Sequence, residues 1–441
     1  MSTVGTGIVR RVAALTVNLT YREVEVVATS DSSDAPTLLV SNHFGGVADA
    51  LLLIYLSPRF PRIVARDVIW SFGVSRAVMT HIEAIPVHKA DDVADPDDAR
   101  AVNDAMFSEC YQALDDGSVV LIFPEGVTQD DPFLAPVKTG AARIVLGARA
   151  AGTSGIAIQP VGIHYEDKAA FRSRVLVAFG EPIDLDATMA GMTAAAENST
   201  GRQVVDDLNT LIDRGMRAAA PDYEDWGEAG DLQLAATVAL RQAAPESAVD
   251  DVPLALSERL GAALARRDAE ARDRVRQAVQ RYRSSLAGLR MSDYQLAGSA
   301  STLPIVGRLA VDLVLMVVLL PYALAGALIS AIPYVLTQST RLIPAAPAVR
   351  ATVMPLVALV VFVLEWVTVA AVVGAGRGWQ LGALVALLVP AFVGATVVVS
   401  ERAVLAWRSL RRLVGSHRAG GPVTAARHDR AEVLSAVRDA L

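Results

Sequence analysis

The sequence of 441 residues contains a single cysteine, Cys110, and three lysines against 37 arginines. One cysteine excludes an intramolecular disulfide framework and a zinc site made of cysteine pairs, and it fits a reducing compartment. The chain has no internal repeat. We expect no cleaved signal peptide, because Arg10 and Arg11 interrupt the N-terminal segment and no apolar core follows them.

Charge is distributed unevenly along the chain. Residues 1–300 carry 28 basic and 41 acidic side chains, whereas residues 301–441 carry 12 basic and 6 acidic side chains. With 53% hydrophobic residues the chain is too apolar for a purely soluble enzyme, and the excess is concentrated between residues 303 and 400. The pattern predicts an acidic soluble part followed by membrane segments with basic flanks that face anionic lipid.

Residues 21–185 alternate short β-rich runs with helical stretches, which predicts an α/β domain with a largely buried sheet. The predicted strands are 24–28, 37–41, 63–65, 84–87, 118–123, 156–163 and 174–178. The predicted helices are 48–57, 68–80, 98–115 and 138–151. Before this domain, residues 1–20 predict an amphipathic helix that either lies on a membrane surface or packs as an ordinary first helix.

Residues 186–300 predict a helical region that begins with a linker at 188–200 and continues with helices at 203–219, 231–244 and 254–289. Residues 301–402 then predict membrane segments. Spans are expected at 353–375 and 379–400, since a hydrocarbon core of about 30 Å needs roughly 20 helical residues. Segment 304–340 forms either a kinked span or, as we expect, a hairpin that does not cross, because Pro321 and Pro333 divide it into pieces shorter than a full span.

Arginines on both outer flanks of the two spans place those flanks, and a basic tail at 403–441, in the cytoplasm. Glu365 lies in the middle of the first of these two spans. It is either a functional carboxylate or a protonated residue packed between helices.

Three segments of the α/β domain carry residues suited to chemistry. Strand 37–41 runs into Asn42, His43, two glycines and then Asp49. A carboxylate that accepts a hydrogen bond from one imidazole nitrogen leaves the other nitrogen to take a proton from a hydroxyl. A purely structural His–Asp pair is the alternative.

The second segment is Pro124, Glu125 and Gly126 at the end of strand 118–123. A carboxylate placed there can accept a hydrogen bond from a substrate hydroxyl, and the glycine allows close approach. In the third segment Lys138 begins a helix beside free backbone N–H groups, which makes it a candidate anion site. Taken singly, these segments also fit an ordinary turn and a solvated cation.

Together the segments resemble the glycerolipid acyltransferase family over about residues 5–225. The first block reads Asn-His-x5-Asp at 42–49, where the family usually has four intervening residues. The second reads Glu-Ala-Ile-Pro-Val-His-Lys at 83–89, with Lys89 where the family usually has Arg. The third reads Phe-Pro-Glu-Gly-x-Thr at 123–128 and continues as Leu-x-Pro-x-Lys-Thr-Gly-Ala-Ala-Arg at 134–143, and the fourth is a strand ending in Pro160.

The resemblance implies a mixed sheet flanked by helices and an enzyme of phospholipid biosynthesis. Such an enzyme moves an acyl chain from a CoA or acyl carrier protein thioester to glycerol 3-phosphate or a lysophospholipid. It implies that His43 is the general base and that Asp49 orients it. The residues implied to bind substrate are Asn42, Lys89, Pro124, Glu125, Gly126, Thr128, Lys138 and Arg143.

No metal, no cofactor beyond the acyl donor and no nucleic-acid partner are expected. The expected location is the cell membrane, with several crossings and the α/β domain on the cytoplasmic side. The alternatives are a non-catalytic lipid-binding membrane protein and a lipid transporter built on the C-terminal segments.

Overall fold

The computed structural model describes residues 3–28, 34–71, 73–88, 96–195, 201–244, 250–297, 302–416 and 420–441. These residues group into two compact units. The α/β unit comprises Met1–Asp222 and Ile343–Leu356, and the helical unit comprises Tyr223–Leu342 and Val357–Leu441.

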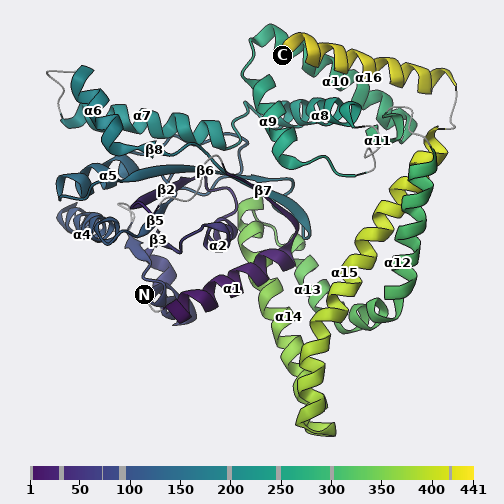
Figure 1. The fold of residues 1–441 in the computed structure, drawn as a ribbon, viewed down its shortest axis with the longest axis horizontal. Coiled ribbons are helices and arrows are strands. Elements are labelled where there is room, and N and C mark those ends of the chain that lie inside the picture. The colour runs from purple at the N-terminus through teal and green to yellow at the C-terminus, as the bar shows by residue number, and fades with distance from the viewer. Residues whose placement is uncertain are drawn as a thin grey trace. The chain divides into compact units, whose positions relative to one another are not determined.

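The α/β unit is built on an eight-stranded sheet in the order β1-β7-β6-β2-β5-β3-β4, with β8 paired to β6 (Figure 1). Strand β2 is parallel to both β5 and β6, whereas β6 and β7 are antiparallel. The mixed sheet that the sequence resemblance implied is therefore confirmed. The strands are β1 (Tyr21–Ala28), β2 (Thr37–Ser41), β3 (Pro61–Arg66), β4 (Ile85–Val87), β5 (Val119–Ile122), β6 (Ala157–Tyr165), β7 (Ser173–Phe179) and β8 (Ile183–Asp184).

Helices cover both faces of the sheet, because successive side chains along each strand point to opposite sides. Leu38 and Val40 of β2 join the apolar core beneath α4, α5 and α7, whereas Leu39 joins the core beneath α1 and α2. The helices of this unit are α1 (Thr3–Thr20), α2 (Val47–Leu56), η1 (Asp67–Ser71), α3 (Gly73–His81), α4 (Pro96–Asp115), α5 (Gly140–Ala150), α6 (Leu185–Ala195) and α7 (Gly201–Ala219).

Two sequence expectations at the ends of this unit are refined by the structure. Helix α1 contacts α2, and its outward side leaves Ile8, Val12 and Leu15 exposed. The linker predicted at 188–200 is wrong over its first part, which belongs to helix α6. Met189 and Met192 pack against the core and hold this small-residue segment in helical form, and residues 196–200 lie outside the described residues.

The helical unit contains a bundle whose segments come from before and after the apolar helices in the sequence. Its helices are α8 (Trp226–Ala243), α9 (Leu254–Ala265), α10 (Ala269–Leu289), α11 (Asp293–Leu296) and α16 (Gly421–Ala440). Arg430 of α16 is buried and donates to Asp293 Oδ1 at 2.9 Å and to Gln242 at 2.7 Å. Tyr282 donates to the same Asp293 oxygen at 2.8 Å. The residues grouped in the sequence as a basic tail thus include a helix of the bundle core.

The apolar region forms four helices, α12 (Thr302–Ile329), α13 (Ala331–Ser339), α14 (Pro347–Arg377) and α15 (Trp379–Ser416). Three segments among the described residues are long and apolar enough to cross a membrane: Ile305–Ile329, Val349–Arg377 and Trp379–Val414. Pro321 lies inside α12 and does not divide it, contrary to the sequence expectation. Apolar helices tolerate proline where neighbouring helices pack around the freed carbonyl groups.

Helices α12 and α15 pack antiparallel. Arg402 of α15 pairs with Asp312 near the start of α12 at 3.0 Å, and the Thr396 hydroxyl donates to Ala323 O at 2.8 Å. Gly326 lies so close to the Phe392 backbone that no side chain fits there. Such close approach at a small residue is how apolar helices associate in lipid.

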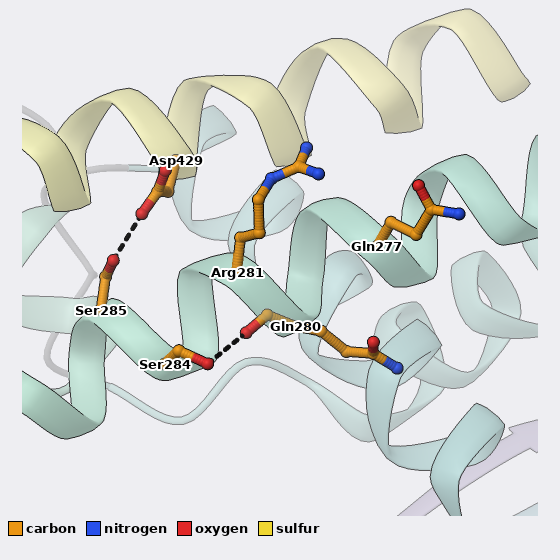
Figure 2. A pocket seen from close by; sticks show the side chains of 6 residues that line it. All are labelled: Gln277, Gln280, Arg281, Ser284, Ser285 and Asp429. Atoms are coloured by element: carbon orange, nitrogen blue, oxygen red, sulfur yellow. Dashed lines mark hydrogen bonds between the residues drawn. The ribbon is translucent and has the colours of Figure 1, made fainter.

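A shallow groove of about 550 Å³ lies between α10 and α16 (Figure 2). The Ser285 hydroxyl donates to Asp429 within it. None of the residues that the sequence predicted for the site lines this groove, which is lined by Gln277, Gln280, Arg281, Ser284, Ser285 and Asp429.

Candidate active site

The candidate site lies where three neighbouring parallel strands end. Strands β6, β2 and β5 are adjacent and point the same way, so their carboxyl ends meet at one edge of the sheet. His43 follows β2, Glu125 follows β5, and β6 ends at Tyr165. The carboxyl edge of parallel strands is the usual place for ligands in open α/β sheets. The fold therefore brings together segments far apart in the sequence.

His43 and Asp49 form a close pair. His43 Nδ1 lies 3.0 Å from Asp49 Oδ2, and the Asp49 side chain is fully buried. The His43 ring stacks on Phe123 with centroids 4.1 Å apart. Because an ionised carboxylate only accepts, Nδ1 carries the proton and Nε2 presents its lone pair. Nε2 has no protein partner among the described residues, and the His43 side chain is 21% exposed.

Two glycines accommodate the five-residue spacing between His43 and Asp49. Gly46 has φ +61° just before α2 begins, a backbone conformation that favours glycine. The Gly45 N–H donates to Asp49 Oδ2 at 2.8 Å. Asp49 thus lies in the first turn of α2, where the helix dipole favours a negative charge. His43 and Asp49 therefore stay paired in this chain although five residues, and not four, lie between them.

Three buried polar side chains, Asn42, Asp49 and Glu125, form what we call the floor of the site. Asn42 accepts from Ile163 N at 2.7 Å and donates to Ile163 O at 3.0 Å, which continues the β2–β6 ladder after β2 ends. Every floor side chain is bound by protein groups, so these residues hold the backbone in place.

The carboxylate of Glu125, which was predicted to contact substrate, accepts hydrogen bonds from three protein groups. It accepts the His43 N–H at 2.9 Å, the Ala135 N–H at 2.9 Å and the Gln129 side-chain amide at 2.9 Å. Burial raises the pKa of Glu125, and the hydrogen bonds from Ala135 and His43 act in the opposite direction. The carboxylate ties the loop after β2 to the loop after β5.

Three exposed side chains, Thr128, Lys138 and Arg143, form what we call the rim. None of the three has a hydrogen-bond or ion-pair partner for its side chain within the described residues. A Cβ atom at Gly126 would lie 2.6 Å from Lys138 Nζ, so this glycine leaves space for the ammonium group.

The backbone of Lys138 lies between the loop after β5 and the start of α5. Pro124 O accepts the Lys138 N–H at 3.0 Å. Thr139 precedes α5 and makes no side-chain cap bond, which leaves the first N–H groups of that helix free of a capping side chain. Lys89, the remaining predicted residue, lies outside the described residues.

Sequence reasoning missed the last residue of β6 and the segment that follows it. The Tyr165 hydroxyl donates to Asp49 Oδ1 at 2.6 Å. Lys168 is 9% exposed and donates to Phe44 O and Gln129 O, both at 3.0 Å, while pairing with Asp130 at 2.7 Å. The available signal was the strand predicted at 156–163, because its end falls at the same sheet edge as the other two.

With this geometry in place, residues 19–164 match the family model described as Acyltransferase. The match confirms, for this part of the chain, the resemblance that the sequence blocks predicted. The matched range holds both His43 and Glu125 and ends one residue before Tyr165.

Curated relatives match part of the chain. Glycerol-3-phosphate O-acyltransferase 2 of Saccharomyces cerevisiae is 36% identical over 124 residues, which are 28% of this chain and 16% of the relative. Glycerol-3-phosphate O-acyltransferase 1 of the same yeast is 28% identical over 129 residues, 29% of this chain and 17% of the relative. The chain therefore spans about a sixth of the length of these relatives.

Among solved structures, the 1-acyl-sn-glycerophosphate acyltransferase PlsC from Thermotoga maritima matches with a TM-score of 0.34 and 15% identity. The match covers 48% of this chain and 78% of that one.

Proposed function

We propose that the protein is a membrane-bound O-acyltransferase that moves an acyl chain from a thioester donor to the hydroxyl of glycerol 3-phosphate or a lysophospholipid. The observation that carries the proposal is the His43–Asp49 pair, which holds the free Nε2 at the open edge of the sheet. A histidine oriented in this way is suited to take a proton from a hydroxyl group. The acyltransferase-family match of residues 19–164 supports the same reaction class.

In the proposed mechanism the acceptor hydroxyl approaches Nε2 of His43. As its oxygen forms a bond to the thioester carbonyl carbon, the hydroxyl proton moves to Nε2. Asp49 stabilises the resulting imidazolium through Nδ1. The C–S bond then breaks, and the proton passes from Nε2 to the departing thiolate, which leaves as the thiol of CoA or acyl carrier protein. Holding donor and acceptor together supplies part of the rate.

Lys138 is the residue that we assign to the acceptor phosphate. Its ammonium is exposed and unpartnered within the described residues, and it lies beside Gly126 at the end of β5. The uncapped first turn of α5 adds backbone N–H groups nearby. A helix start and a lysine together favour a phosphate group.

The test is acyl transfer by the purified protein in lipid vesicles. Glycerol 3-phosphate and a panel of lysophospholipids are offered with acyl-CoA and acyl carrier protein donors, and products are identified by mass spectrometry. We expect a product that contains the acyl chain and the acceptor, and none from the His43→Ala variant. Binding of lysolipid without any product, by folded protein, would overturn the proposal in favour of a lipid-binding protein.

We further propose that α14 and α15 cross the membrane and that α12 and α13 form a hairpin entering from the cytoplasmic side and returning to it. Arg308 of α12 pairs with Asp250 of the bundle, and Asp312 pairs with Arg402. The uncharged remainder of α12, residues 313–329, measures about 25 Å at 1.5 Å per residue, less than a hydrocarbon core of about 30 Å.

The packing of α12 against α15 also indicates that α12 reaches only part of the way along the α14–α15 pair. Gly326 lies against Phe392, so the end of α12 at residue 329 falls near residue 390 of α15. About 11 residues, or roughly 16 Å of helix, separate that point from Gly378 between α14 and α15. Helix α12 therefore reaches only about half the depth of the α14–α15 pair.

Connections at both ends of the region support an even number of crossings. The α16 helix returns to the bundle through the buried Arg430–Asp293 pair, so the chain enters and leaves the membrane on one side. At the start of α14, the Thr352 hydroxyl accepts the Val47 N–H at 3.3 Å within the α/β unit. The nine residues of α13 cover about 14 Å and are too short to cross.

Single-cysteine labelling in sealed vesicles tests this topology. Cys110 is replaced first, although burial already raises the pKa of its thiol to about 12. Gly378→Cys is expected to react from outside and Ala345→Cys only when the inner face is exposed. Leu328→Cys, at an exposed position of α12, is expected to react from neither side before detergent is added. Labelling of position 328 from outside would make α12 a crossing helix.

A further inference from the structure

We propose that Tyr165 is a positioning residue of the acyl-transfer site, which acts on His43 through Asp49. The inference rests on the proposed function and adds a third member to the His43–Asp49 pair. The observation is the short hydrogen bond of 2.6 Å from the Tyr165 hydroxyl to Asp49 Oδ1, the carboxylate oxygen that does not bond His43.

The position of Tyr165 follows from the sheet. It is the last residue of β6, and β6 lies beside β2, which delivers His43 to the same edge. Asn42 bonds both backbone groups of Ile163, two residues before Tyr165, and so fixes where β6 ends relative to the His43 loop. The tyrosine therefore approaches Asp49 from the side opposite the imidazole.

The Asp49 carboxylate is surrounded by donors. Oδ2 faces His43 Nδ1 and the Gly45 N–H, and Oδ1 accepts from Tyr165. Burial, followed by the charge of Asp49, raises the pKa of Tyr165 well above its usual value. The phenol consequently remains a donor at every pH at which the site works. Its bond fixes the carboxylate plane and draws negative charge toward Oδ1, away from the imidazole.

Gly45 packs directly against the hydrogen bond between Tyr165 and Asp49. A Cβ atom at this position would lie 2.5 Å from the Tyr165 hydroxyl oxygen and 2.9 Å from Asp49 Oδ1. Any side chain there would push the phenol and the carboxylate apart. Gly45 thus leaves room for the hydrogen bond from Tyr165 to Asp49, and it also donates its own N–H to Asp49.

The consequence is measurable as a change in the pH dependence of His43. Without the tyrosine bond, Asp49 keeps more negative charge on the oxygen that faces the ring, which favours the protonated imidazole. The acidic limb of the kcat/KM profile is then expected to move upward by about 0.5–1 pH unit. Loss of the fixed carboxylate plane is expected to lower kcat about tenfold, with KM values for both substrates within about twofold of wild type.

The experiment compares Tyr165→Phe with Tyr223→Phe in the 441-residue chain. Tyr223 is a buried tyrosine of the helical unit whose hydroxyl donates to Glu258 at 3.1 Å, so its change also removes a tyrosine–carboxylate bond but leaves the Asp49 bond in place. Rates are measured from pH 5 to 9 beside thermal unfolding. A second readout needs no substrate: the rate at which diethylpyrocarbonate modifies His43, followed by peptide mass spectrometry, reports the protonation of the ring.

A lower kcat with an upward-shifted acidic limb in Tyr165→Phe, absent from Tyr223→Phe, supports the proposal. An unshifted limb overturns it, whether kcat is unchanged or falls, because a purely structural role lowers the rate without moving the profile. If the wild-type protein transfers no acyl group, the modification profile of His43 still decides the role of Tyr165. Gly45→Ala provides a second variant, in which the modification profile is expected to shift in the same direction.

Discussion

The floor and the rim of the site are both made of polar side chains, but the two sets differ in burial and in their hydrogen-bond partners. Asn42, Asp49 and Glu125 of the floor are buried, and their polar atoms contact protein groups. The side chains of Thr128, Lys138 and Arg143 on the rim are exposed and lack protein partners within the described residues. The sequence blocks therefore contain two groups of residues. The buried group fixes the backbone of the site, and the exposed group has side chains that are available to a ligand.

The largest expected effect lies at the residue between floor and rim. We expect His43→Ala to lower kcat/KM by a factor on the order of 10²–10⁴, because the general base is lost. Steady-state rates with the preferred donor and acceptor measure it. His81→Ala, at an exposed helical histidine, is the control and is expected to retain wild-type activity within about twofold. Activity of His43→Ala close to wild type would remove this residue from the mechanism.

Asp49→Asn tests whether Asp49 of the floor fixes the imidazole tautomer of His43. An amide cannot accept from Gly45, Tyr165 and His43 together, and its NH₂ group favours the imidazole tautomer with the proton on Nε2. That tautomer cannot take a proton from the acceptor, so we expect a rate loss on the order of 10²–10³ with folding retained. Unchanged turnover would show that Asp49 has a structural role only.

Lys138→Met tests the rim. A charge-assisted contact contributes about 1.5–3 kcal/mol, so the KM for a phosphate-bearing acceptor is expected to rise by roughly 10- to 150-fold. The donor KM and the thermal unfolding temperature are expected to stay near wild type, because the side chain is exposed and unpartnered in the described structure. An equal rise in KM for a phosphate-free acceptor would assign Lys138 to the fold.

Glu125→Gln has the smallest expected effect on rate and the clearest effect on stability. The three donors at the carboxylate cannot all be satisfied by an amide, which leaves a buried N–H facing another N–H. We expect a loss of about 1–3 kcal/mol in the free energy of unfolding and a less than tenfold fall in kcat. Denaturant unfolding measures the first. A large rise in acceptor KM with normal stability would instead place Glu125 in contact with substrate.

Much of the α/β fold was predictable because its strands are short, apolar and separated by turn residues. Seven of the eight strands lie where the sequence predicted them, while the two-residue β8 is too short to give a periodic signal. The predicted linker failed at α6, since tertiary contacts of Met189 and Met192 outweigh the small-residue composition. Pro321 does not break α12, because neighbouring helices pack around the carbonyl group that the proline leaves without its hydrogen bond.

The contacts of the candidate site follow from the sequence to different degrees. His43 and Asp49 are only six residues apart, so their pairing follows from local sequence. The turn of Glu125 toward the His43 backbone depends on β2 and β5 being neighbours, a relation between residues 82 positions apart. Tyr165 is 116 positions from Asp49, and a single tyrosine at a strand end carries no motif. Such contacts are created by sheet order, which a linear pattern does not contain.

The return of α16 to the bundle has a consequence for biosynthesis. Arg430 pairs with the buried Asp293, yet more than a hundred residues, including helices α12 to α15, are synthesised between them. Domains fold as units during synthesis, so the sheet and helices within Met1–Asp222 can form early, whereas α8 and α10 must wait with an incomplete core. The bundle closes only after α14 and α15 have been made, and until then the emerging chain exposes the apolar surface that α16 later covers.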